Sequence, residues 1–273
     1  MGYHAKIILD SIAPNGIRLT TMELRYPRIV HAEMLRHRVY SRSVASSRAI
    51  PVLKQIEKIK NDPFIPERWQ ANQKGMVAGD ELSAGDSAKA REIWLDALAY
   101  AEKKTLQLVE LNVHKEIANR LMEVFSYTVE LVTGTEWDNF YDLRVASPAQ
   151  PQIEKIAHMA RDAQQASTPT KLARGEWHMP MLRQEDLHLS LEDRKAISAG
   201  RCARLSYETH YGVRDTSADI ALQADLIREK HWSPMEHQAT PAKSGDDWSG
   251  NFRGWVQNRK ILEVAALQPK KSD

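Results

Sequence analysis

Apolar and polar residues follow two different periods along this chain, and these periods predict its strands and helices. Residues 5–10 and 17–24 are rich in branched side chains, and the turn signal Pro14-Asn15-Gly16 separates them, which predicts two strands. Residues 127–132 alternate in the same way. Helical spacing predicts a helix that starts at Pro51 and further helices over residues 27–35, 114–125, 135–144, 153–163, 190–207 and 217–230. It also predicts the longest helix, which carries Ile93 to Leu111 and whose apolar side chains are expected to form core.

Three stretches lack a clear period. Residues 62–85 contain prolines and glycines and predict a long loop, which in a compact protein is more often functional than idle. Residues 167–189 predict a linker or lid, so the chain divides into residues 1–166, this connection, and residues 190–273, with the first and last parts expected in the same domain in space. Residues 251–259 predict a helix, either one that faces an anion or an amphipathic surface helix.

The composition limits the class of protein. The 273 residues carry a formal net charge of +2, which gives no global electrostatic reason to bind nucleic acid. The single cysteine, Cys202, excludes an internal disulfide and suits a reducing compartment. Neither a signal peptide nor an apolar run of about 18 residues is present, so we expect no membrane partner and a cytoplasmic location, or the host cytoplasm if the chain is viral.

The most unusual polar stretch runs from Arg36 to Arg48. It contains four arginines, four serines and a histidine. Guanidinium groups bind phosphate or carbonyl edges through two parallel hydrogen bonds, and hydroxyl groups add further donors, so this stretch predicts an anion site. The alternative is a solvated basic turn.

Other polar groups are less specific when taken singly. His231, Glu236 and His237 lack the spacing of a helical histidine pair, so no metal site is expected. Cys202 lies in a helical pattern and favours a structural role over that of a nucleophile. The chain has neither a Gly-x-Gly-x-x-Gly sequence nor a phosphate-binding loop that ends in Gly-Lys-Ser/Thr.

Taken together, four segments resemble one family. Arg36-His37-Arg38, followed after seven residues by Ser46 and then Arg48, resembles the signature of the flavin-dependent thymidylate synthases, the ThyX family. The other segments similar to this family are Lys115 to Ala118 with Arg120, Tyr127-Thr128, Asn139-Phe140, Leu143-Arg144 and Ala149-Gln150; Arg204-Leu205-Ser206-Tyr207; and His231 with Ser233-Pro234-Met235-Glu236-His237.

The order of these segments differs from the family order. The last two come first in the family, whereas here they follow the arginine stretch. A circular permutation that moved about residues 190–263 explains this order, since permutations are tolerated when the original termini lie close together. We therefore expect Arg36 and His231 to meet around one site.

The resemblance implies an α/β (α+β) fold with a central antiparallel sheet flanked by helices. It also implies a homotetramer that binds FAD and dUMP where subunits meet and makes dTMP, with methylenetetrahydrofolate as carbon donor and NADPH as reductant. Because flavin brings the hydride, no covalent nucleophile is needed, in agreement with the setting of Cys202.

Residue roles also follow from the resemblance. Arg144 would read the uracil edge, Arg48 would bind the phosphate and Arg36 would lie between nucleotide and flavin. The implied catalytic residues are Arg144, Ser46 and Arg36; the implied dUMP-binding residues are Glu33, Arg36, Ser46, Ser47, Arg48, Arg120 and Arg144; the implied FAD-binding residues are His37, Arg38, Ser43, Asn139, Ser206, His231 and Ser233. Ser46 favours hydrogen bonding over nucleophilic attack, because no partner base is apparent.

Five positions depart from the family pattern, namely Glu33 for Gln, Ser43 for Asn, Asn119 for Arg, Pro148 for His and, as a mild change, Met235 for Phe. Since Glu33 and Asn119 lie in the substrate half, an alternative hypothesis is C5 methylation or hydroxymethylation of another uridylate such as UMP. A non-enzymatic alternative is a nucleotide-binding or nucleic-acid-binding module, which the near-neutral charge disfavours.

Overall fold

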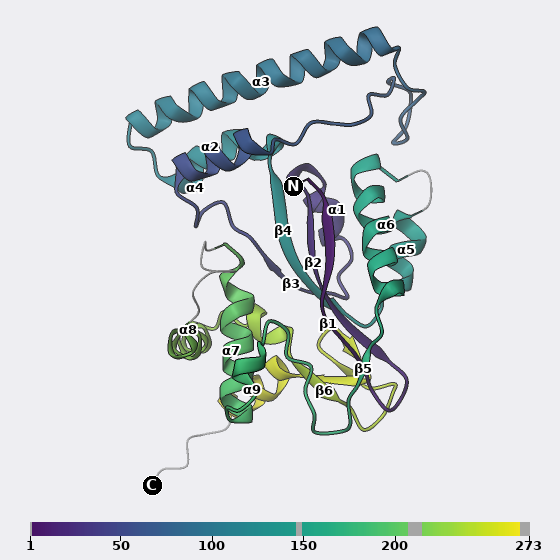
Figure 1. Ribbon diagram of the computed structural model, residues 1–273, viewed down its shortest axis with the longest axis vertical. Helices are drawn as coiled ribbons and strands as arrows, with labels where there is room; N and C mark the ends of the chain where they lie inside the picture. Colours follow the sequence, from purple (N-terminus) through teal and green to yellow (C-terminus); the bar gives the residue numbers. More distant parts are fainter. Residues whose placement is uncertain (1, 146–148, 207–214, 268–273) are drawn as a thin grey trace.

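Five strands form a central sheet in the computed structural model, which describes residues 2–145, 149–206 and 215–267. All neighbouring pairs are antiparallel except β1 and β5, which are parallel. The mixed α/β fold with a central, mostly antiparallel sheet flanked by helices is therefore confirmed, as are the strands predicted near residues 5–10, 17–24 and 127–132 (Figure 1). The strand order across the sheet is β3 (Ser41–Val44), β4 (Tyr127–Gly134), β2 (Arg18–Pro27), β1 (His4–Ile12) and β5 (Thr170–Lys171).

Helices α5 (Asp138–Arg144) and α6 (Pro151–Ala166) cover one face of the sheet (Figure 1). The short helix η1 (Arg28–Val30) leads into α1 (His31–Leu35) beside the same core. Alternate residues of β2 and β4 point to this face because side chains alternate along a strand. The buried cluster contains Met22, Leu24, Tyr26, Val30, Met34, Val132, Phe140, Ile153 and Ile156.

The C-terminal third covers the opposite face. Cys202 of α7 (Leu191–Ala203) and Leu205 of η4 (Arg204–Ser206) pack against Leu131 of β4. The remaining elements of this part are η3 (Gln184–Asp186), α8 (Thr216–Arg228), η6 (Ser233–Glu236), β6 (Ala239–Pro241), β7 (Trp248–Ser249), β8 (Phe252–Arg253), β9 (Trp255–Gln257) and α9 (Asn258–Leu267).

The helix predicted for residues 251–259 is wrong in both of its forms. Phe252 and Trp255 lie in the strands β8 and β9 and are fully buried against Leu19. Gly254 joins these strands with a positive φ of 71°, a conformation that breaks a helix and favours glycine. The helix begins only at Asn258.

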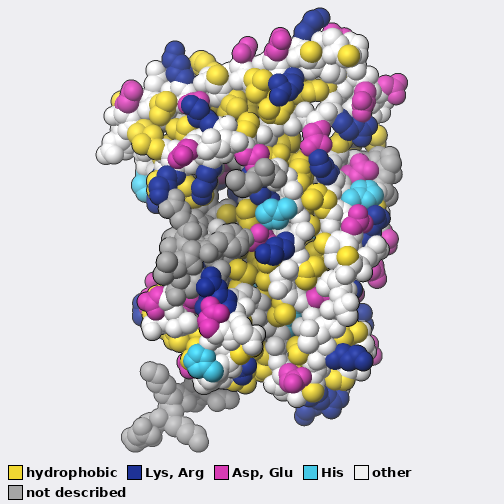
Figure 2. Space-filling view, in the orientation of Figure 1, with side chains coloured by type: hydrophobic (Ala, Val, Ile, Leu, Met, Phe, Trp, Pro, Cys, Tyr) yellow, Lys and Arg dark blue, Asp and Glu magenta, His cyan; other side chains and the backbone are white. Residues whose placement is uncertain are grey.

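A helical layer stands at one end of β4, made of α2 (Val52–Asn61), α3 (Ala84–Glu110), α4 (Lys115–Ala118) and η2 (Asn119–Phe125). Trp94 and Leu98 of α3 pack on the cluster formed by α2 and η2, but Ile93 is 69% exposed and Leu111 is 75% exposed. The expectation that all apolar positions of this helix form core is therefore wrong, because α3 packs along one side only. Figure 2 shows apolar side chains gathered over α2 and α3 on the surface. None of the helices in the described ranges is long and apolar enough to cross a membrane.

Candidate active site

Residues from two distant segments meet at the end of α5. Arg144, in the last turn of this helix, donates from Nε to His37 Nε2 over 3.0 Å and from Nη2 to the Glu33 carbonyl over 3.5 Å. Arg36 and Arg38 follow α1 with exposed side chains, whereas His37 between them is buried. The arginine stretch and the 139–144 segment are therefore in direct contact.

Burial and neighbouring charge set the protonation of this group. Burial, followed by the charges of Arg144 and Arg42, lowers the pKa of His37 to about 4, so its imidazole is neutral near pH 7. Since a guanidinium can only donate, His37 accepts at Nε2 and carries its proton on Nδ1. Burial and the charge of Arg36 lower the pKa of Arg144, while the charge of Glu33 opposes them.

Arg36, Arg38 and Arg144 form no ion pair with a carboxylate in the part of the chain that the structure describes. Among the described residues, an added anion could therefore approach these three charges without displacing a carboxylate. This arrangement favours a ligand that offers phosphate or carbonyl oxygens.

The second half of the arginine stretch is more strongly tied to the protein. Ser47 Oγ donates to Glu123 Oε1 over 2.6 Å, and Arg120 Nη1 donates to the same oxygen over 2.7 Å. Burial alone would raise the pKa of Glu123, but these hydrogen bonds outweigh burial and lower it. Arg48 Nε lies 3.8 Å from a Glu116 carboxylate oxygen, and the Arg48 backbone N–H donates to Ser46 Oγ. A phosphate bound here would compete with two carboxylates.

Asn119 stabilises the loop at residues 47–50. Its buried side-chain amide donates to the backbone carbonyls of Ser47 (2.6 Å) and Ile50 (3.0 Å). A residue that departs from the family pattern thus holds the loop rather than facing an added ligand. Arg120, one position later, contacts the same region through Glu123.

The far end of the chain meets the arginine stretch at β3. His237 Nε2 lies 3.0 Å from Ser43 Oγ, and its Nδ1 lies 2.8 Å from Thr133 Oγ1. Gln257 donates to Ser41 Oγ over 3.0 Å, which adds a second link. The sequence motif contained His237, but nothing in sequence placed it against Ser43 or Thr133, because both contacts span more than a hundred residues.

The other FAD-site predictions lie at the surface. His231 is exposed with Nδ1 3.6 Å from a Glu229 carboxylate oxygen, and the side chains of Ser233 and Asn139 are also exposed. The contact between the arginine stretch and the 231–237 segment is thus made by His237. The side chain of Ser206, together with Pro148 and Tyr207, lies outside the described residues.

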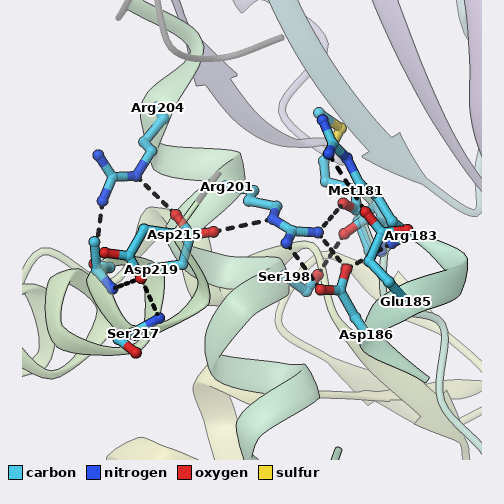
Figure 3. Close-up of polar contacts among 12 residues, drawn as sticks. Met181, Arg183, Glu185, Asp186, Ser198, Arg201, Arg204, Asp215, Ser217 and Asp219 are labelled. Atoms are coloured by element: carbon cyan, nitrogen blue, oxygen red, sulfur yellow. Dashed lines mark hydrogen bonds and ion pairs between the residues drawn. The ribbon is translucent and has the colours of Figure 1, made fainter. Parts of the chain in front are cut away.

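Arg204, the first residue of the fourth motif segment, has a visible packing role (Figure 3). Arg204 Nε donates to Asp219 Oδ1 over 2.8 Å, and the buried Arg201 donates to Asp219 Oδ2 over 3.0 Å. Arg201 also pairs with Asp186 and donates to the Met181 carbonyl. This network holds η4, α7, α8 and the segment around η3 together.

Comparison with known proteins places these segments in a family. The model of the Thy1 family, described as thymidylate synthase complementing protein, matches residues 19–170, more than half of the 273-residue chain. The chain belongs to this family. The Thy1 match spans β2 to β5, including the arginine stretch, η2 and α5, and confirms the resemblance inferred from Arg36 to Arg48.

A solved structure agrees with the Thy1 assignment in fold. A crystal structure of the UMP/dUMP methylase PolB from Streptomyces cacaoi bound with 5-Br UMP matches with a TM-score of 0.50 at 17% identity, covering 59% of this chain and 88% of that chain. A second PolB structure, bound with 5-Br dUMP, matches with a TM-score of 0.45 at 20% identity, covering 54% of this chain and 66% of that chain. No curated protein sequence matches significantly.

Proposed function

We propose that this protein is a flavin-dependent thymidylate synthase that methylates dUMP at C5 to give dTMP, with methylenetetrahydrofolate as carbon donor and NADPH as reductant. The observation that carries the proposal is the Thy1 match over the segments that bring Arg36, His37 and Arg144 together. Fixed positive charge beside a uracil carbonyl favours addition of hydride to the ring, because it stabilises the negative charge that develops on the oxygen.

Arg144 is the proposed reader of the uracil edge. His37 and the Glu33 carbonyl hold its guanidinium from two sides and fix the plane in which it donates. Arg36 adds charge beside it. Ser46, Ser47, Arg48 and Arg120 are proposed to bind the phosphate. It would take the place of Glu123 as the partner of Ser47 and Arg120, and of Glu116 as the partner of Arg48.

Four of the residues proposed to bind FAD are exposed and polar. Exposed Arg38, Asn139, His231 and Ser233 offer donors suited to an anionic dinucleotide, and His37, Ser43 and Ser206 complete the proposed set. Bound flavin would supply the hydride to the pyrimidine. The chain's own side chains bind and orient the two ligands.

We also propose a homotetramer and a circularly permuted motif order. Three exposed apolar side chains, Leu35, Val39 and Leu143, flank the arginines without carboxylate partners, and a second copy would cover them. The Ser43–His237 contact supports permutation, because it brings the moved segment back to the arginine stretch.

Purified protein incubated with methylenetetrahydrofolate, NADPH and either dUMP or UMP tests the function. We expect the visible absorption band of bound flavin, dTMP from dUMP, and a mass by light scattering of four chains. Methylation of UMP alone would replace dUMP as the substrate. Absence of flavin and of turnover, together with salt-dependent DNA binding, would favour a binding module and overturn the proposal.

A further inference from the structure

A continuous line of hydrogen bonds crosses the face of the sheet that the C-terminal third covers. It contains one side chain from each of four strands and two histidines inserted between them. The successive contacts are Ser11 Oγ to His178 Nδ1 (2.9 Å), His178 Nε2 to Thr21 Oγ1 (2.8 Å), Thr21 Oγ1 to Thr133 Oγ1 (2.7 Å), Thr133 Oγ1 to His237 Nδ1 (2.8 Å) and His237 Nε2 to Ser43 Oγ (3.0 Å).

The line is closed to solvent at one end and open at the other. Ser11 is 1% exposed, and the four internal members are 0% exposed. Ser43 is partly exposed and belongs to the arginine stretch. Ser43 is therefore the member of this line whose hydroxyl group can donate to, or accept from, solvent or a ligand.

Proton counting restricts how the bonds can run. Each hydroxyl group carries one proton, and a neutral imidazole donates from one nitrogen and accepts at the other. Burial lowers the pKa of His178 and of His237 to about 3, so both rings are neutral near pH 7. In each ring, a nitrogen that accepts a hydrogen bond on one side therefore requires the other nitrogen to donate on the opposite side.

The two rings must then share a tautomer. If both carry the proton on the same nitrogen, all five bonds run in one direction and every internal proton is used. If they differ, either the 2.7 Å contact between Thr21 and Thr133 contains no proton, or one of these buried hydroxyl protons has no acceptor in the line. Both arrangements are costly in a buried site.

The closed end selects the direction. In the described part of the chain, Ser11 Oγ has His178 as its side-chain partner. If the bonds ran toward Ser11, its own proton would be buried with no acceptor among the residues that the structure describes. If they run toward Ser43, the last proton reaches a partly exposed position where solvent or a ligand can accept it.

We propose that this line makes Ser43 an obligatory hydrogen-bond donor to a carbonyl or ring-nitrogen acceptor of the planar heterocycle bound beside the arginine stretch, with His178 and His237 both protonated on Nε2. His237 and Thr133 are positioning residues that act through Ser43. The identity of the ligand, flavin or pyrimidine, rests on the proposed function, whereas the direction of the line does not.

Neutron diffraction from perdeuterated crystals of the full chain tests the direction without any assay. We expect deuterium on Nε2 of both histidines and none on their Nδ1 atoms, with the Ser43 deuterium pointing away from His237. Deuterium on Nδ1 of either ring, or on both nitrogens of one ring, would overturn the proposal.

Variants of Thr133 test the consequence for binding. Thr133→Val removes the proton donated to His237 Nδ1, so His237 can change tautomer and accept the Ser43 proton. We expect weaker binding of the ligand that Ser43 serves, by about tenfold, the loss typical of one hydrogen bond. Titrations with FAD and with dUMP identify that ligand, and Thr133→Ser should restore the affinity.

Two further variants separate this role from simple destabilisation. Thr105→Val removes a buried hydroxyl group that has no hydrogen-bond partner among the described residues, and it should leave both affinities unchanged. Ser43→Ala should reproduce the loss of Thr133→Val, and the double variant should lose no more, because both changes remove one interaction. Additive losses, or unchanged binding in Thr133→Val, would contradict the proposal. Wild-type protein that binds neither ligand would contradict the proposed function instead, and leave the neutron result standing.

Discussion

Arginines in and around the candidate site divide by whether a carboxylate already neutralises them. Arg42 lies 3.7 Å from the buried Glu130, Arg120 pairs with Glu123, and Arg48 lies near Glu116. Arg144 instead has a neutral imidazole and a backbone carbonyl as its partners. Its charge is held in place but not neutralised, so it has the most to contribute to an incoming carbonyl or phosphate.

Replacing Arg144 tests this division. Arg144→Ala should weaken dUMP binding by about ten- to a hundredfold, since a charge-assisted hydrogen bond contributes about 1.5–3 kcal/mol. FAD should remain bound, as judged by its visible absorption, while calorimetry gives the dUMP affinity. Arg161→Ala, which removes a surface arginine paired with the adjacent Asp162, should change neither. Loss of FAD with retained dUMP binding would show that Arg144 serves the flavin.

At the scale of elements, the pattern of apolar residues predicted most of the fold, because the branched residues of β1, β2 and β4 and the helical spacing in the main helices are local signals. It failed at β8 and β9, where Phe252 and Trp255 are buried by β2 and the 13–19 turn rather than by a helix partner. It also overestimated the core of α3, because the same apolar spacing arises whether a helix face is covered or left at the surface.

The site was predictable only where residues belong to a motif. The arginine stretch and Arg144 lie in two segments that resemble the same family, so their meeting followed from the family resemblance. The line through His178, Thr21 and Thr133 has no such signal, because hydroxyl groups on strands are ordinary and their partners lie 112–157 residues away. Only the register of β2 against β4 places Thr21 opposite Thr133.

Helices α7 and α8 approach closely at Gly200. A Cβ atom added there would lie 2.4 Å from the Asp219 carbonyl oxygen, which is backbone and cannot rotate away. Gly200→Ala should therefore separate the helices, weaken the Asp219 pairs with Arg201 and Arg204, and lower the free energy of unfolding by about 1–3 kcal/mol.

Gly85→Ala is the matched control for this change. At the start of α3 the added Cβ would meet only Ser83 Oγ at 4.0 Å, so alanine should be neutral or stabilising by up to about 1 kcal/mol. Thermal melting at one protein concentration compares the two variants. Equal melting temperatures would show that α7 and α8 can move apart without loss.

At the scale of the whole molecule, the C-terminal third is bound to the N-terminal part by polar as well as apolar contacts. Arg253 Nε donates to Glu136 Oε1 over 2.8 Å, Trp255 donates to the Ile17 carbonyl, and Asn251 donates to the Tyr40 carbonyl. The two buried histidines lie within this contact, so the attachment of one part to the other depends on their remaining neutral.

Acid should therefore weaken the protein well above the pH at which its carboxylates titrate. His178 and His237 have folded pKa values of about 3 because of burial, against 6.5 for an unperturbed histidine. Below pH 6.5 the unfolded state binds more protons, so the stability present above this pH is lost as the pH falls toward 3. Each histidine should remove about 2 kcal/mol between pH 7 and pH 5.

Urea unfolding at pH 7, 6 and 5 measures this loss, and the two histidines together predict a decrease of about 4 kcal/mol by pH 5. His31 and His37, whose pKa values burial lowers to about 4, act in the same direction. Burial raises the pKa of Glu130, which opposes the loss only where that carboxyl group binds a proton. In the variant His237→Gln the slope should become shallower, because one of the two buried rings is removed. A free energy of unfolding that is constant from pH 7 to pH 5 would contradict this prediction, because it would mean that the histidine pKa values in the folded protein equal those of the unfolded chain.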